Sequence, residues 1–112
     1  MTKYLISFPS EAMVLSEADL EAAGRDSRAV IAAAKAAGVY VFAGGINEGV
    51  EPVKVAADGA ISAELYPGSQ LAGGFAVFEL PNREAAVIWA SRLAAACRCD
   101  QELREFMYDP AS

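Results

Sequence analysis

The sequence predicts an α+β fold in which two helices cover one face of an antiparallel sheet. Three observations favour this class. Two alanine-rich stretches carry helical periodicity, short runs of β-branched and aromatic residues stand before and after each stretch, and an Asp-Gly pair joins two further short runs. A chain of 112 residues is long enough for one small core, so we expect a single domain over residues 1–112.

The first helix is expected over residues 17–37. Ser16 and Asp19 form a capping box at its start, in which the serine hydroxyl accepts a free backbone N–H of the first turn. Gly38 ends the helix, because glycine tolerates the left-handed conformation that often follows a helix. The apolar face is narrow and consists mostly of small side chains, so we expect the helix to lie close to the sheet that it covers.

The stretch Gly73–Ala86 predicts a strand that leads into the second helix. Phe75 and Phe78 have opposite parity in the strand at residues 74–80, so each face of that strand carries a bulky side chain. Asn82 is the N-cap of the helix that follows. We interpret the glycine pair as structural, allowing a close strand approach or a bulge, since a phosphate-binding turn should open a helix and not a strand.

The other strands are short runs of β-forming residues. They are expected at residues 3–8, 39–43, 53–56, 60–63 and 101–108, with Asp58-Gly59 as the turn of a hairpin in the middle of the chain. The resulting order, β-α-β-(hairpin)-β-α-β, is that of a ferredoxin-like sandwich with an extra hairpin.

Aromatic side chains indicate that both faces of the sheet are covered. Two helices can cover only one face of a four-stranded sheet, and the opposite face should then be polar. Instead, eight of the ten aromatic residues fall in predicted strands, namely Tyr4, Phe8, Tyr40, Phe42, Phe75, Phe78, Phe106 and Tyr108. Because the chain supplies no third helix, we expect a homodimer in which two sheets pack face to face through an isologous contact.

Composition and charge argue against several classes of partner. The formal net charge is -6, with nine basic residues scattered among fifteen acidic ones, which argues against nucleic acid and anionic membranes as partners. No apolar run approaches the roughly 20 residues that a membrane span requires. The N-terminus also lacks a signal-peptide pattern, so we expect a cytoplasmic protein.

The chain contains no histidine, which excludes Ser-His-Asp and Cys-His nucleophiles. Any acid–base chemistry would need a shifted carboxylate, a tyrosine or a lysine. Cys97 and Cys99 are too close in sequence for an unstrained disulfide, and they lack the further ligands of a zinc site. We therefore expect no metal and no cofactor, with Cys97 packed inside the protein and Cys99 in a loop.

Several short motifs occur in a characteristic order. They are Lys3-Tyr4-Leu5-Ile6, Ala36-Ala37-Gly38-Val39, the hairpin turn Asp58-Gly59, Leu71-Ala72-Gly73-Gly74-Phe75, Leu80-Pro81, Glu84-Ala85-Ala86 and Trp89-Ala90. In this order and spacing the chain resembles, over nearly its whole length, the YCII-related domains and particularly the branch named for an Asp-Gly-Pro-Phe motif. The resemblance implies a dimeric α+β barrel, in which two ferredoxin-like units pack through their sheets.

The chain departs from that family at the residues associated with chemistry. The family often has a histidine in the first helix, eleven residues before the closing glycine, and Ser27 occupies that position here. Members of the YCII type carry an aspartate shortly after the tryptophan of the second helix, but no acid follows Trp89 within four residues. The naming motif is also absent, near residues 62–65. The resemblance therefore implies a member without the histidine–aspartate dyad.

Five residues are candidates for ligand binding: Ser27, Tyr66, Phe75, Glu79 and Arg104. Ser27 either lines a pocket or bonds back to its own helix. Tyr66 either caps a pocket or packs as an amphipathic cover. Glu79 and Arg104 are charges inside predicted strands, and they would be the best polar groups for a cavity if they face each other in the barrel.

Arg25, Asp26 and Arg28 form a charged cluster in the first helix. A pair of arginines can hold a carboxylate ligand. The alternative is that these charges lie on the solvated face of the helix, where they contribute little.

Three functions remain open from the sequence. The first is a small homodimeric binding or accessory domain, with a cavity between helix and sheet or at the dimer interface that suits a small apolar or aromatic molecule. The second is an enzyme of the dimeric α+β barrel type, such as an isomerase, lyase or dehalogenase that acts on a small cyclic or phenolic compound, a hypothesis that rests on fold analogy. The third is a structural or regulatory partner with a filled barrel.

Overall fold

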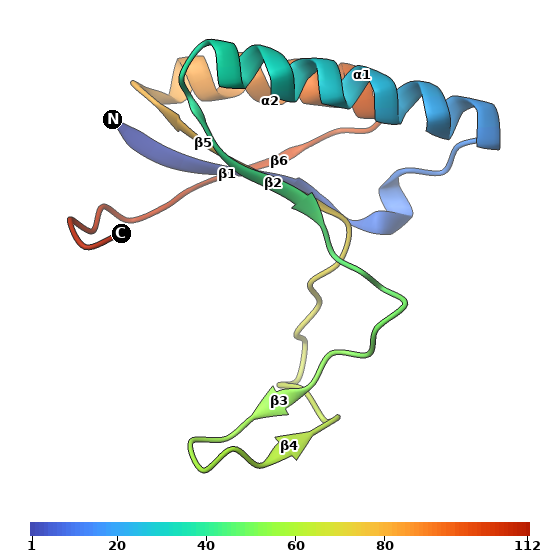
Figure 1. Cartoon of the computed structure of the whole chain (residues 1–112), viewed down its shortest axis with the longest axis vertical. Helices are drawn as coiled ribbons and strands as arrows, with labels where there is room; N and C mark the ends of the chain where they lie inside the picture. The colour runs from blue at the N-terminus through green and yellow to red at the C-terminus, as the bar shows by residue number, and fades with distance from the viewer.

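The computed structural model covers residues 1–112 and shows an α+β body from which a hairpin arm projects (Figure 1). Helices α1 (Glu17–Ala36) and α2 (Arg83–Cys97) lie side by side over one face of a four-stranded sheet. The strands are β1 (Thr2–Phe8), β2 (Tyr40–Gly45), β5 (Gly74–Leu80) and β6 (Glu102–Glu105) in the sheet, and β3 (Lys54–Val55) and β4 (Ile61–Ser62) in the arm. A short 3-10 helix, Ser10–Ala12, follows β1. The arrangement is compatible with a ferredoxin-like α+β fold.

The sheet has the strand order β2-β5-β1-β6, and every pair of neighbouring strands is antiparallel. The predicted antiparallel sheet with two helices is therefore confirmed. The register between β2 and β5 shifts between Tyr40 and Phe42, where β2 has a bulge. As a result Tyr40 pairs with Phe78 on the helix side, whereas Phe42 pairs with Val77 on the opposite side.

The core lies between the sheet and the two helices. Phe78, Ile6 and Leu80 are its largest fully buried side chains, and small alanines of both helices pack against them. The Trp89 ring meets Phe78 edge-on, with 5.5 Å between the ring centroids. Burial alternates along β5, so that Phe75 and Phe78 lie on opposite faces of the strand as the sequence predicts.

The predicted caps at Ser16, Asn82 and Gly38 are confirmed. The Ser16 hydroxyl accepts the backbone N–H of Asp19 at 3.2 Å, and the Asn82 side chain accepts that of Ala85 at 2.9 Å. Gly38 follows the last turn of α1 with a φ of 74°, in the left-handed region that terminates helices. These caps satisfy backbone donors and acceptors that a helix end would otherwise leave unpaired.

Two strand ends differ from the sequence prediction by more than one residue. The last strand ends at Glu105 and not at Tyr108, which is 84% exposed. Glu105 pairs with Tyr4, and beyond it the Phe106 N–H donates to the carbonyl of Lys3 at 3.0 Å before the chain leaves β1. Strand β2 is longer than predicted, since Gly44 and Gly45 continue it by pairing with β5.

The arm, residues 46–72, carries the predicted hairpin. Strands β3 and β4 pair only with each other, and the turn between them has Gly59 at a φ of 89°. The Asp58 carboxylate accepts the backbone N–H of Ala60 at 2.9 Å. The arm stands away from the helices and the sheet (Figure 1), and the radius of gyration is 15.8 Å. A globular chain of this length would have a radius of about 13 Å.

Candidate ligand-binding site

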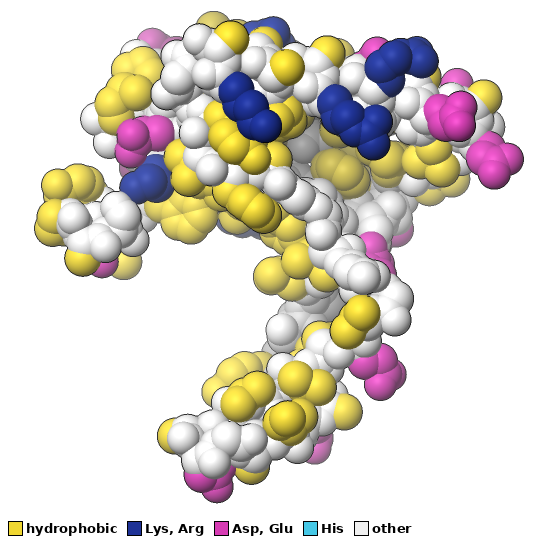
Figure 2. Space-filling view, in the orientation of Figure 1, with side chains coloured by type: hydrophobic (Ala, Val, Ile, Leu, Met, Phe, Trp, Pro, Cys, Tyr) yellow, Lys and Arg dark blue, Asp and Glu magenta, His cyan; other side chains and the backbone are white.

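The largest hollow in the molecule lies beneath α1, above the end of the sheet where β2 meets β5. It has a volume of about 800 Å³ and is lined by 21 residues, of which 13 are hydrophobic. We refer to it as the α1 groove. Figure 2 shows basic side chains along the side of α1 that faces this groove, with apolar side chains beneath them.

The α1 groove exists because the surfaces that face each other there carry small residues. Gly45 and Gly74 offer no side chains from the sheet, Ala43 offers only a methyl group, and α1 contributes Ala23 and Gly24 to the lining. The expectation that small residues would bring α1 close to the sheet was therefore wrong at this end. Helix α1 packs chiefly along α2, and the space over the glycines stays open.

The polar groups of the α1 groove are few. Ser27 lines the groove, and its hydroxyl donates to the carbonyl of Gly24 at 3.0 Å, which is the bond back to its own helix. The Tyr40 hydroxyl accepts the backbone N–H of Ala43 at 3.2 Å. The Lys35 ammonium lies 4.9 Å from the centroid of the Tyr40 ring, which is a cation–π distance.

Of the five predicted ligand-binding residues, Ser27 and Phe75 line the α1 groove. Phe75 lies on the opposite face of β5 from Phe78 and also lines two of the other hollows. Tyr66 lies in the arm and is 75% exposed. The Lys54 ammonium lies 5.3 Å from the centroid of the Tyr66 ring. Tyr66 lines none of the larger hollows. Tyr66 therefore covers none of these four hollows.

Glu79 and Arg104 lie on the open face of the sheet, the face that the helices do not cover, and each has its own partner. Glu79 is 3.7 Å from the Lys3 ammonium, and Arg104 is 3.2 Å from Glu102. Strand β1 runs between their two strands, and no ion pair within the chain joins them. Glu79 lines a hollow of about 330 Å³, and Arg104 lines a separate hollow of about 320 Å³.

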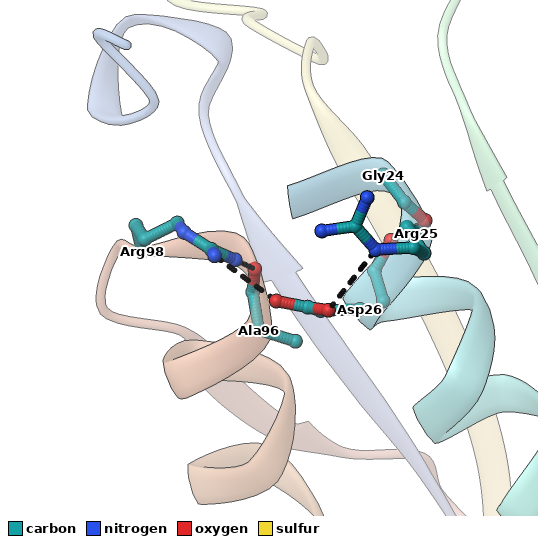
Figure 3. Close-up of polar contacts among 6 residues, drawn as sticks. Gly24, Arg25, Asp26, Ala96 and Arg98 are labelled. Atoms are coloured by element: carbon teal, nitrogen blue, oxygen red, sulfur yellow. Dashed lines mark hydrogen bonds and ion pairs between the residues drawn. The ribbon is translucent and has the colours of Figure 1, made fainter. Parts of the chain in front are cut away.

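The charged cluster of α1 divides into two parts. Figure 3 shows Asp26 between Arg25 and Arg98, at 3.9 Å and 3.0 Å from their nitrogens. Arg98 also donates to the carbonyl of Ala96, so this part links α1 to the end of α2. Arg28 belongs to the other part, because it lines the α1 groove and forms no ion pair.

No known protein-family model matches the chain, and no curated protein matches it either. No group of three or more histidine, cysteine, aspartate or glutamate side chains is placed to hold a metal ion. Neither α1 nor α2 combines the length and hydropathy of a membrane-crossing helix.

Lys35 is the residue of the α1 groove that sequence reasoning missed. It follows Arg28 by seven residues, which is close to two helical turns, so the two side chains lie on one side of α1. That spacing was a usable signal. Grouping Arg28 with its sequence neighbours conceals this signal, because Arg25 and Asp26 pair with each other and not with Arg28.

Cys97 is buried at the floor of the α1 groove, and Cys99 is partly buried beside it. Burial raises the pKa of the Cys97 thiol above its ordinary value of 9.0, and the nearby Cys99 raises it further. Burial also raises the pKa of Cys99. Both thiols are therefore protonated at neutral pH and poor nucleophiles.

Alkaline pH is expected to destabilise the protein through Cys97. Because its folded pKa is raised, the folded state holds the proton more tightly than the unfolded state does. That contribution to stability is complete below pH 9.0 and is lost as the pH rises through the folded pKa. Urea unfolding at about pH 8 and about pH 10 should show a smaller loss in Cys97→Ala than in wild type. Equal losses would contradict this role of Cys97.

Proposed function

We propose that the chain is a small homodimeric ligand-binding domain of the YCII-related type, and that the α1 groove takes a small, largely apolar molecule. The groove is the observation that carries the proposal. Its volume of about 800 Å³ lies within the range of small-molecule sites, about 300 to 1,000 Å³. Its mostly apolar lining with a few polar groups is also typical of such sites.

The remaining parts of the proposal have their own support. The YCII-related type is supported by the sequence motifs between Leu71 and Trp89 and by the order of the helices and strands.

Filling the α1 groove is expected to abolish binding and to stabilise the fold at the same time. Gly24 lies inside α1, and a Cβ built there would meet only the Arg28 guanidinium, at 3.7 Å. Gly24→Leu should therefore raise the free energy of unfolding by about 0.5–1 kcal/mol, through helix propensity. The affinity for the neutral probe 2-naphthalenemethanol should fall at least about tenfold, as measured by calorimetry.

Gly24→Ala is the matched control for this variant. It gains the same helix propensity but fills much less of the groove, so its affinity for the probe should remain near that of wild type. If Gly24→Leu is folded and still binds the probe with wild-type affinity, the probe does not occupy the groove and the proposal is wrong. A thermal-shift screen against a metabolite panel would then identify natural ligands of the wild-type protein.

The open face of the sheet supports the homodimer. Strand pairing aligns Phe42, Val77 and Leu5 in one row across β2, β5 and β1. Phe42 is exposed, and Val77 and Leu5 are only half-buried. The ion pairs Lys3–Glu79 and Arg104–Glu102 flank this apolar row. An apolar centre with a charged rim is the usual composition of a protein interface.

The hairpin arm also supports the proposed homodimer. An isolated two-stranded hairpin is marginally stable in water, and here Val53, Val55, Ile61 and Leu71 are all at least half exposed. Within one chain, β3 and β4 have no neighbouring strand or helix to cover them. A second copy that covers the open face of the sheet would lie on the side from which the arm projects.

Val77→Asp is expected to dissociate the dimer without unfolding the protomer. Val77 lies at the centre of the open face, where dimerisation would bury an unpaired carboxylate. Light scattering should give twice the chain mass of 11.7 kDa for wild type and the chain mass for the variant, at about 10 μM protein. Val87→Asp, on the exposed side of α2, is the control and should remain dimeric. Monomeric wild type would refute the homodimer.

A further inference from the structure

The α1 groove has an electrostatic character opposite to that of the whole chain. The chain has fifteen acidic and nine basic residues, with a net charge of -6. None of the 21 residues that line the groove is acidic, yet Arg28 and Lys35 are among them. At the average acidic content of the chain, two or three acidic residues would be expected in a lining of this size. The groove is therefore a locally positive site on an acidic protein.

The two cations are available to a ligand. Neither Arg28 nor Lys35 has a carboxylate within 4.0 Å, since the four ion pairs of the chain involve other residues. They stand on the same side of α1, about 10 Å apart along its axis. The Arg28 guanidinium lies close to the position that a Cβ of Gly24 would take, so the missing side chain gives it room at the groove.

The rest of the α1 groove suits an apolar body. Leu20 and Ile31 of α1, together with Phe8 and Met13, line it and keep part of their apolar surface exposed. A molecule seated there would remove apolar surface from water while its charged end remained at the rim. Buried apolar area would then supply affinity, and the cations would decide which head group is accepted.

We propose that the α1 groove binds an amphipathic monocarboxylate, a compound with an aromatic or aliphatic body and one carboxylate. This inference rests on the proposed function, because it names the class of molecule that the groove takes. The carboxylate lies at Arg28, whose planar fork with several N–H donors matches the two oxygens. Lys35, held over the Tyr40 ring, adds positive charge at the other end of the rim.

The test is calorimetric titration with three probes that share one apolar body: 2-naphthoate, 2-naphthalenemethanol and 2-naphthylmethylammonium. Wild type should bind the carboxylate about tenfold more tightly than the alcohol, and the ammonium compound most weakly. Arg28→Gln should reduce the affinity for 2-naphthoate about tenfold and leave that for the alcohol unchanged. Arg25→Gln, a change on the same helix at a residue outside the groove lining, is the control and should bind all three like wild type.

The outcomes separate the inference from the proposed function. If the alcohol binds as tightly as the carboxylate, and Gly24→Leu abolishes both, the groove is a binding site without anion preference and this inference falls alone. If Arg25→Gln weakens 2-naphthoate binding as much as Arg28→Gln does, the general positive charge of α1 and not a direct contact with the Arg28 guanidinium is responsible. That result would also overturn the inference of a carboxylate site at Arg28. If no probe binds wild type at millimolar concentration, the inference and the proposed function fall together.

Discussion

Gly73→Ala is expected to cost at least about 3 kcal/mol and to leave little folded protein. A Cβ at this position would lie 2.0 Å from the carbonyl oxygen of Phe8, 2.8 Å from the nitrogen of Ser10 and 2.9 Å from the carbonyl carbon of Pro9. These are backbone atoms, which cannot turn aside as the end of a flexible side chain can. Gly73 also has a φ of 90°, which adds about 1–2 kcal/mol of strain for an L-residue.

Gly38→Ala separates the two contributions. Gly38 has a similar φ of 74°, but a Cβ there would meet nothing within 4 Å. Its loss of stability should therefore be about 1–2 kcal/mol, from backbone conformation alone. Urea unfolding of both variants provides the comparison. If Gly73→Ala lost no more stability than Gly38→Ala, the close approach of Gly73 to Phe8 would not exist in the native protein.

Phe78→Ala is expected to destabilise the protein by about 3–5 kcal/mol, the usual cost of removing a large buried ring. Phe78 is 0% exposed and stands where the sheet meets α2. Its ring packs edge-on against Trp89 and lies 6.4 Å from the Tyr40 ring, between centroids. The alanines around it are too small to fill the cavity that would remain.

Val87→Ala is the control for this core variant. Val87 is on α2 but is 50% exposed, so its truncation should change the free energy of unfolding by no more than about 0.5 kcal/mol. Thermal and urea unfolding measure both variants. A loss below about 1.5 kcal/mol for Phe78→Ala would show that the ring is not at the centre of a single core.

The sequence predicted the features that follow local rules. Ser16 and Asn82 cap their helices because a short polar side chain before a helix can reach the first turn. Asp58-Gly59 forms the hairpin turn because glycine adopts the positive φ that the turn needs. The opposite faces of Phe75 and Phe78 follow from the period of two along a strand.

The features that sequence reasoning missed depend on long-range geometry. The strand pattern of residues 101–108 continues beyond Glu105, whereas pairing with β1 stops there, opposite Tyr4. Strand β1 separates Glu79 from Arg104. The alternation of side chains along one strand does not predict the order of the strands in the sheet, so the sequence could not show this separation. Predicting the α1 groove would have required two long-range facts. Helix α1 packs along α2, and small residues of the sheet line the groove beneath α1, namely Ala43, Gly44, Gly45 and Gly74.

A titration of isotope-labelled protein with 2-naphthoate, followed by two-dimensional amide NMR, tests the central claim most directly. If the α1 groove is the ligand site, the largest saturable shifts should occur at the amides of Gly24, Ser27, Gly44 and Gly74, which line it. Leu5 and Val77 on the open face of the sheet should shift little. Saturable shifts confined to the open face or to the arm, with the groove amides unchanged, would contradict the account.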